Sequence, residues 1–293
     1  MTHCGKGADM QGAVSGQPDY MVVGHITRDL NQAGGFTIGG TAAYAARTAR
    51  ALGCSVRVVT SAPEDLHLGD VLPDVEILRV PAPAATTFEN HYTRTGRVQT
   101  VRAVAASLTP DVVPSVWREA AAIVHLGPVA QECDPLLHDL FPGSFLGLTP
   151  QGWMRRWDEV GRVQPSPWDS AELLLPRADA VVLSEGDVGG DEGLIARWAA
   201  VAQVLAVTRG AAGCTVHSGG VGEDLPGFPV TEIDSTGAGD VFAAVFFVQL
   251  QRGYSPRAAA RMANCVAAVS VTRPGLDGTP GPEELNRCRK FQL

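Results

Sequence analysis

Short apolar runs, ended by glycine or by polar residues, recur along the chain and predict buried strands. The first run is YMVVG at 20–24, and VRVVT follows at 56–60. Between them, the alanine-rich segment 39–53 begins with two glycines and ends with another, as a helix with a C-terminal glycine does. A strand, a helix and a second strand in this order favour a right-handed parallel unit, so the pattern predicts an α/β core.

Four further apolar runs extend this core toward the C-terminus. Segments long enough for helices separate them, and we therefore expect each run to add a strand to a mostly parallel sheet flanked by helices. The four runs are 121–127, 144–150, 179–185 and 204–210.

The polarity pattern changes between residues 75 and 104. Here β-branched and aromatic residues alternate with polar ones, with a turn at Thr95–Gly96, which is typical of antiparallel strands with one wet face. Neighbouring side chains on such a strand point to opposite faces, so only one of Glu89 and Asn90 can face a ligand, and we favour Asn90. The sequence thus predicts a small antiparallel sheet inserted into a larger domain.

Length and charge narrow the function. The chain has 293 residues, which fits one large α/β domain, and a formal net charge of −8. Nucleic-acid backbones and anionic membranes select basic surfaces, so the charge favours a small soluble ligand as the main partner. Residues 1–19 lack the apolar stretch of a secretory signal, and no later run reaches 18 apolar residues. We expect a flexible leader at 1–19 and one folded domain at 20–293 of a cytoplasmic protein.

The spacing of the cysteines and histidines does not indicate a disulfide framework or a metal centre. The six cysteines are scattered, with no C-x-x-C pair and no histidine in zinc spacing, so we expect them to be unpaired and buried in a reducing compartment. The seven histidines form no i, i+4 metal pair.

The segment EIDSTGAGDVFAA at 232–244 carries the strongest chemical signal. Gly237, Ala238 and Gly239 precede a helix-length apolar run, so they stand at a helix N-terminus, where unpaired amides and the positive end of the helix dipole attract a phosphate. Asp240 follows in the first turn, where it can take a proton. A glycine turn or a first-turn aspartate also occurs for structural reasons alone, but the combination points to phosphoryl transfer to an alcohol.

At this point the chain resembles the ribokinase/PfkB family of sugar and nucleoside kinases. DSTGAGDVFAAVF at 234–246 is similar to the family's second signature, and GGTAAYAARTARALG at 39–53 matches the first. The resemblance runs in order from about residue 20 to 290. It implies a ribokinase-like fold whose small sheet, with strands around 31–38 and 75–104, is a lid over the sugar. It also implies ATP and Mg²⁺ as cofactors.

The resemblance further implies a role for individual residues. Asp240 corresponds to the base that deprotonates the acceptor hydroxyl, and the backbone of Gly237, Ala238 and Gly239 to the anion hole. Asp29 corresponds to the carboxylate that grips two sugar hydroxyls, while Gly39 and Gly40 let the backbone close on the sugar. Nucleotide contacts are implied for Thr208, Gly210, Thr236, Gly237, Gly239 and Asn264.

Two positions depart from the family pattern. The family often has Asn-x-x-Glu where this chain has Ser184 and Asp187, and either Asp187 or Glu185 can still support the water shell of a magnesium ion. Tyr44 replaces an asparagine, and its ring can stack on a cyclic polyol or a base, which favours a cyclitol such as myo-inositol, or a nucleoside, over ribose. TTFENHYT and TPQGWMRRW are similar to the inositol-kinase branch.

We therefore expect an ATP-dependent kinase of a small sugar or polyol. A nucleoside kinase remains an alternative, as does a non-catalytic nucleotide-binding or sugar-binding regulator, which the altered magnesium motif favours and Asp240 disfavours. A dehydrogenase is disfavoured because no G-x-G-x-x-G follows the first strand. Arg155 and Arg156 lie either on a solvated helix face or against the substrate. Unpaired lid strands predict a homodimer. The acceptor, and ATP over another phosphoryl donor, stay open.

Overall fold

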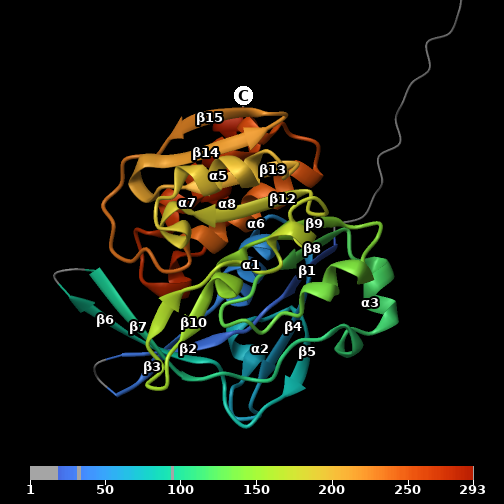
Figure 1. Ribbon diagram of the computed structural model, residues 1–293, viewed down its shortest axis with the longest axis vertical. Helices are drawn as coiled ribbons and strands as arrows, with labels where there is room; N and C mark the ends of the chain where they lie inside the picture. Colours follow the sequence, from blue (N-terminus) through green and yellow to red (C-terminus); the bar gives the residue numbers. More distant parts are fainter. Residues whose placement is uncertain (1–18, 32–33, 94–95, 293) are drawn as a thin grey trace, which may run out of the picture.

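The computed structural model describes residues 19–31, 34–93 and 96–292, so all but the last residue of the expected leader lies outside the described residues. A nine-stranded sheet runs through the molecule in the order β15-β14-β13-β12-β9-β8-β1-β4-β5 (Figure 1). Its strands are parallel except β14 and β15, which add an antiparallel edge. The strands are β1 (Asp19–Val23), β4 (Ser55–Ala62), β5 (Glu76–Pro81), β8 (Ile123–Leu126), β9 (Phe145–Leu148), β12 (Ala180–Ser184), β13 (Val204–Thr208), β14 (Gly213–Ser218) and β15 (Val221–Pro226).

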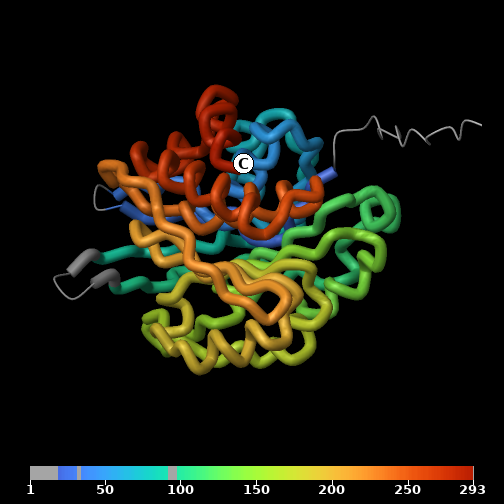
Figure 2. Tube along the Cα trace, turned by 90° about the horizontal axis from the view of Figure 1, so that it is seen from above, coloured from blue at the N-terminus to red at the C-terminus, as the bar shows by residue number. Residues whose placement is uncertain are grey.

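Helices cover both faces of this sheet because side chains alternate along the strands. Tyr20 and Val22 of β1 pack with α1, α6, α7 and α8, whereas Met21 and Val23 pack with α3, α4 and α5. Figure 2 shows the two helical layers on either side of the sheet. The helices are α1 (Thr41–Ala51), α2 (Leu68–Val71), α3 (Ser115–Ala120), α4 (Ala171–Leu174), α5 (Glu192–Ala199), α6 (Ala238–Gln251), α7 (Pro256–Ser270) and α8 (Pro282–Arg289). None of the helices in the described part of the chain has the length and apolarity needed to cross a membrane. These findings confirm the α/β expectation.

A four-stranded sheet in the order β3-β2-β6-β7, hereafter the lid sheet, projects from the main body. It contains two antiparallel pairs, β2 with β3 and β6 with β7, and β2 runs parallel to β6 where the two pairs meet. Its strands are β2 (Thr27–Leu30), β3 (Phe36–Gly39), β6 (Thr87–Thr93) and β7 (Gly96–Ala103), and a short hairpin of β10 (Arg155–Trp157) and β11 (Val163–Pro165) lies beside it.

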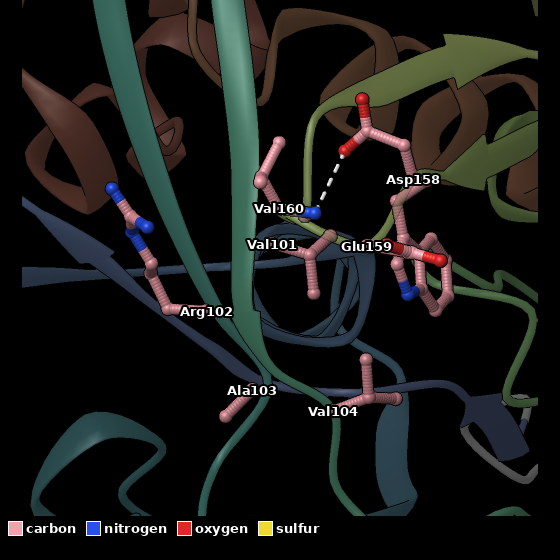
Figure 3. Close-up of a pocket in the computed structure, with 9 residues that line it drawn as sticks. Val101, Arg102, Ala103, Val104, Asp158, Glu159 and Val160 are labelled. Carbon is pink, nitrogen blue, oxygen red and sulfur yellow. Dashed lines mark hydrogen bonds between the residues drawn. The ribbon is translucent and has the colours of Figure 1, made fainter.

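The two outer edges of the lid sheet differ. On the β7 edge, Val101 N donates to Gly161 O at 2.8 Å. Asp158 holds this loop in shape, because its Oδ1 accepts from the backbone N of Val160 at 3.1 Å (Figure 3). The same oxygen accepts from the backbone N of Arg162 at 2.8 Å. On the opposite edge, β3 pairs with β2 alone among the described residues. The β7 edge is therefore bonded to a loop of the chain itself at Val101. Among the described residues no second strand pairs with β3, although β3 contacts the short 3-10 helix Gly275–Gly278.

The roots of the lid sheet meet at a buried histidine. His25 precedes β2, and its ring hydrogen-bonds the Thr86 hydroxyl before β6 at 2.6 Å and the Ala106 carbonyl after β7 at 3.0 Å. The backbone N of His25 donates to the buried carboxylate of Glu132 at 2.9 Å. The three segments that connect the lid sheet to the core near residues 25, 86 and 106 therefore share one hydrogen-bond network, which fixes the lid sheet to the core.

Two expectations need correction. Residues 75–81 are not part of the lid, because β5 pairs parallel with β4 at the edge of the large sheet. An edge strand is half-exposed, and its polarity alternates as an antiparallel strand's does. The expectation of unpaired cysteines is also wrong for Cys265 and Cys288, which form a disulfide between α7 and α8. Cys54, Cys133 and Cys214 are free and buried, and Cys4 lies outside the described residues.

Candidate active site

A cavity of about 810 Å³ lies between the large sheet and the lid sheet. It opens where β9, β12 and β13 end, at Thr149, Ser184 and Thr208, which is where α/β proteins commonly bind ligands. Its size is within the range of small-molecule sites. Most of the site residues expected from the sequence line it together: Asp29, Gly40, Tyr44, Asn90, Asp187, Thr208, Gly210, Thr236, Gly237, Ala238, Gly239, Asp240 and Asn264. Gly39 and Glu185 do not line it.

The glycine turn is held in shape on both sides. Gly237 is the N-cap of α6 with φ of 77°, a left-handed conformation that favours glycine. A Cβ at this position would also lie 2.3 Å from the ring of Tyr44, so no larger residue fits. Ahead of the turn, the Asp234 carboxylate accepts from Thr236 N at 2.9 Å and from Gly275 N at 2.8 Å. The turn at the start of α6 is therefore preorganised, as an anion hole must be.

Asp240 lies in the first turn of α6 at the wall of the cavity, and its pKa is shifted. Burial raises the pKa of Asp240 to about 6, a hydrogen bond from Thr41 and the positive charge of Arg155 oppose this rise, and the negative charge of Asp187 adds to it. A carboxylate with a pKa near the working pH is ionised at neutral pH and still able to hold a proton, which suits a general base.

One end of the cavity lies beside the lid sheet and is hereafter called the acceptor end, because the sequence predicts acceptor contacts there. It combines a carboxylate with backbone that approaches closely. Asp29 on β2 is half-buried, and a Cβ on Gly39 would lie 2.5 Å from its Oδ2. Gly40 has φ of 90°, and a Cβ there would lie 2.3 Å from the carbonyl oxygen of His25. The two glycines thus leave room for the Asp29 carboxylate and for the close passage of α1 beside the lid.

The lid sheet adds two amides and an aromatic ring to the acceptor end. Asn90 on β6 and Gln99 on β7 are cross-strand partners, and Gln99 Nε2 donates to Asn90 Oδ1 at 3.0 Å. Both line the cavity together with Phe88. Glu89 instead forms an ion pair with Arg102 away from the cavity. Polar amides beside an apolar ring suit a ligand with hydroxyl groups on a carbon ring.

Arg155 is the one cationic side chain among the described residues that line the cavity. It lies on strand β10, so the expected helix face is wrong for both arginines, and Arg156 is exposed. Arg155 Nη1 donates to Val129 O at 3.2 Å, and the guanidinium carbon lies 5.9 Å from the centre of the Phe88 ring. These contacts hold a positive charge close enough to Asp240 to lower its pKa.

Tyr44 is placed differently from the stacking face expected for the acceptor. Its side chain is 2% exposed, and its ring packs beneath Gly237. Burial, followed by the charges of Asp234 and Asp240, raises the pKa of Tyr44. Within the described residues its hydroxyl is buried without a hydrogen-bond partner. The ring therefore supports the anion turn from below and presents little surface to a ligand.

The far end of the cavity suits a nucleotide base. Thr208 is the last residue of β13 and Gly210 follows it. Asn264 on α7 donates weakly from Nδ2 to Leu225 O at 3.4 Å and to Pro226 O at 3.5 Å. The side chains around them are mostly apolar: Phe228, Val230, Ala267, Ala268 and Val271. An apolar slot of this kind can bind an aromatic ring system.

Of the two carboxylates considered for magnesium, Asp187 faces the cavity. It accepts from Ser184 N at 2.8 Å and from Gln151 Nε2 at 3.1 Å, whereas Glu185 pairs with Arg209 at 3.1 Å. The described residues hold no cluster of three His, Cys, Asp or Glu able to bind a metal alone. One carboxylate still fits magnesium, which keeps several waters and binds phosphate oxygens.

The polar lining residues missed at the sequence level include Thr41, Gln99, Thr149 and Gln151. Thr41 follows the Gly39–Gly40 pair directly, and Thr149 ends a predicted strand, which are the usual places for functional side chains in an α/β protein. Those two positions gave a usable signal. Gln99 gave none, because its role depends on the register between β6 and β7.

Comparison with known proteins shows what parts of this chain are similar to. Residues 178–282 match the family model described as pfkB family carbohydrate kinase. Fructokinase-2 of Oryza sativa subsp. japonica is 29% identical over 118 residues, which are 38% of this chain and 35% of that protein. The matched segment thus spans little more than a third of this curated relative, and residues 178–282 carry the family resemblance.

Solved structures show the fold over nearly the whole chain. A structure described as a pyrophosphate-dependent kinase in the ribokinase family, complexed with a pyrophosphate analog and myo-inositol, matches with a TM-score of 0.78 and 20% identity, covering 92% of this chain and 99% of that one. Arabidopsis thaliana ribokinase complexed with ribose and ATP matches with a TM-score of 0.73 and 19% identity, covering 94% and 99%. The fold is ribokinase-like.

Proposed function

We propose that this chain, which carries a pfkB family carbohydrate kinase domain in a ribokinase-like fold, transfers the γ-phosphoryl group of ATP to a hydroxyl of a small neutral polyol. The observation that carries the proposal is Asp240, a carboxylate with a raised pKa, next to the glycine turn that begins α6. A base beside an anion hole, in a cleft with polar amides at one end and an apolar slot at the other, is what phosphoryl transfer to an alcohol requires.

In this proposal the chain's own groups divide the work. Asp240 takes the proton of the acceptor hydroxyl, while the backbone N–H groups of Gly237, Ala238 and Gly239 stabilise charge on the transferred phosphoryl group. Arg155, which also lines the cavity, adds a positive charge close enough to act on Asp240. Magnesium, when bound, neutralises phosphate charge, and Asp187 is the carboxylate that would hold it through water.

Charge favours a neutral acceptor. The acidic residues that line the cavity are Asp29, Asp187, Glu232 and Asp240. Arg155 is the single positive charge among the described lining residues, so the cavity is negative before any phosphate binds. An anionic sugar would be repelled, whereas hydroxyl groups can donate to Asp29 and bond with Asn90. The complex of a similarly folded kinase with myo-inositol makes this cyclitol the first acceptor to test.

The apolar slot favours ATP over pyrophosphate as phosphoryl donor. Phe228, Val230 and Ala267 offer a surface that a base can cover, and pyrophosphate has no group to fill it. Placing a charged side chain in this apolar slot is a direct test. Ala268→Glu should raise the KM for ATP at least tenfold and leave that for the acceptor unchanged, because it puts a charge into the slot.

The test of the function is an acceptor screen with each phosphoryl donor. Sugars, cyclitols and nucleosides are incubated with ATP or pyrophosphate and Mg²⁺, and the phosphorylated product is measured. We expect turnover with ATP and at least one neutral polyol, and a rate lower by about 10²–10⁴ with the Asp240→Asn variant as matched control. Background rates with every acceptor and both phosphoryl donors would refute the proposal. Tight binding of ATP without turnover would identify a regulatory protein of the same fold instead.

We further propose a homodimer that forms through the lid sheet. Within the lid sheet, β3 pairs with β2 alone among the described residues, and Phe36 on β3 is 46% exposed. Unpaired edge strands are usually covered by another chain or by charge. Light scattering at micromolar concentration should give twice the mass of the chain, and a monomer would contradict this assignment.

A further inference from the structure

A buried hydrogen-bond chain leads from the first strand to the wall of the cavity. The Tyr20 hydroxyl on β1 bonds to Nδ1 of His125 on β8 at 2.8 Å, and Nε2 of His125 bonds to the Thr149 hydroxyl at the end of β9 at 2.8 Å. Tyr20 and His125 are buried at 1% and 0% exposure, and edge-on contacts with the rings of Tyr20 and Phe247 fix the imidazole. Thr149 alone of the three lines the cavity.

The protonation states of Tyr20 and His125 decide which atom donates in each of these hydrogen bonds. Burial lowers the pKa of His125 to about 3, so the imidazole is neutral and carries one N–H. Burial likewise raises the pKa of Tyr20, which keeps its proton, and Nδ1 of His125 is its one acceptor in the described part of the chain. Tyr20 therefore donates to Nδ1, and the imidazole proton must be on Nε2.

The consequence falls on Thr149. Because His125 Nε2–H donates to its oxygen, the Thr149 hydroxyl cannot use that bond for its own proton, which remains available for the cavity. The reverse order would leave the Tyr20 proton buried without an acceptor, which is costly.

Thr149 is close to the reacting end of the cavity. A Cβ built on Gly127 would lie 3.1 Å from Thr149 Oγ1 and 2.4 Å from Thr41 Cγ2, so the two threonines meet above this glycine. Thr41 is the residue that hydrogen-bonds Asp240. The segment that follows Thr149 carries Gln151 and Arg155, which line the same cavity.

We propose that Thr149 is a hydrogen-bond donor to a hydroxyl oxygen of the acceptor, and that Tyr20 and His125 are positioning residues that fix the direction of its proton. The inference rests on the proposed function for the identity of the ligand, but the proton order does not. An acceptor oxygen that receives this bond is left with its own proton free for Asp240. The Tyr20–His125–Thr149 hydrogen bonds thus orient the acceptor hydroxyl with its proton toward Asp240.

The proton order is tested first, in the ligand-free protein and without any assay of turnover. The ¹⁵N chemical shifts of the His125 ring distinguish a protonated from an unprotonated nitrogen, and a His125→Gln variant assigns the signals. We expect a neutral ring with the proton on Nε2 between pH 5 and 8. A proton on Nδ1, or a ring that titrates in this range, would overturn the inference even if the enzyme is an active kinase.

The role toward the acceptor is tested by kinetics with the acceptor that the screen identifies. Thr149→Val keeps the shape and removes the hydroxyl, so the acceptor KM should rise roughly three- to tenfold while the KM for ATP stays unchanged. Thr149→Ser should restore the wild-type value. Tyr20→Phe removes the hydroxyl that donates to the His125 imidazole, so it should give part of the increase in the acceptor KM. The double variant should have an acceptor KM no higher than that of Thr149→Val alone.

An unchanged acceptor KM in Thr149→Val, or additive increases in the double variant, would overturn the proposed role of Thr149. Thermal melting of each variant separates these effects from misfolding, and failure of the wild-type enzyme with every acceptor would refute the proposed function instead.

Discussion

Lowering the pH should switch off Asp240 in a range where an ordinary aspartate would still be ionised. With a pKa of about 6, about nine tenths of the Asp240 side chains are carboxylates at pH 7 and about one tenth at pH 5. Since only the carboxylate accepts a proton, kcat/KM for the acceptor should fall about tenfold between these values. At the ordinary pKa of 3.8, more than nine tenths would still be ionised at pH 5, and the rate would hardly change.

The assay is a pH profile of kcat/KM for the acceptor from pH 5 to 8 at saturating ATP and Mg²⁺. Bound phosphate groups add negative charge beside Asp240, which keeps the acidic limb at or above pH 6. ATP itself titrates in this range, so a variant must separate the two. Thr41→Val removes the hydrogen bond that lowers the pKa of Asp240 and should move the limb to higher pH, whereas Thr41→Ser should leave it in place. A flat profile down to pH 5, or a limb that Thr41→Val does not move, would refute the assignment of Asp240 as the base.

Three further substitutions test the site. Asp240→Asn should lower turnover by about 10²–10⁴ and leave ATP binding by calorimetry nearly unchanged. Because the pKa of Asp240 is raised in the folded state, its carboxylate destabilises the fold above pH 6 and not below about pH 4. The Asp240→Asn variant should therefore gain up to about 3 kcal/mol of unfolding free energy at pH 7 and none at pH 3.5. Denaturant titration at the two pH values measures this difference. Asp29→Ala should raise the acceptor KM at least tenfold and the KM for ATP little, because each charge-assisted hydrogen bond contributes about 1.5–3 kcal/mol; equal changes in both constants would argue against a contact with the acceptor. Tyr44→Phe should melt at the same temperature as the wild type or higher, because the buried hydroxyl lacks a hydrogen-bond partner among the described residues. Tyr44→Ala should lose roughly 3–5 kcal/mol of unfolding free energy and most of its turnover. A well-folded, active Tyr44→Ala enzyme would show that the ring does not support Gly237.

The core of the fold could be read from the sequence because its strands are buried on both faces. The runs at 121–127, 144–150, 179–185 and 204–210 became β8, β9, β12 and β13 in a parallel sheet. Strand β5 could not be assigned in the same way, since an edge strand is half-exposed and alternates in polarity wherever it pairs. The Cys265–Cys288 disulfide also left no trace, because α7 and α8 bring together two cysteines whose spacing matches no motif.

The site was predictable where a backbone conformation forces the residue type. Gly237 and Gly40 need positive φ and closely approaching neighbours, and such requirements leave glycine in the sequence. Side chains that depend on long-range register leave no such mark. Tyr20 and His125 are 105 positions apart and meet only because β1 and β8 are neighbours, and the burial of Tyr44 beneath Gly237 depends on how α1 packs on α6.

The unequal edges of the lid sheet limit what this molecule can assemble into. A sheet with two open edges can pass strand pairing from copy to copy and grow into a fibre. Here the loop held by Asp158 is bonded to β7 at Val101, which blocks strand pairing there, whereas no described strand pairs with the outer side of β3. Two copies that pair β3 with β3 around a twofold axis use up the open edge of each, so strand pairing stops at a closed dimer. Loss of the loop contact would reopen the second edge and turn a self-limiting assembly into one that can propagate.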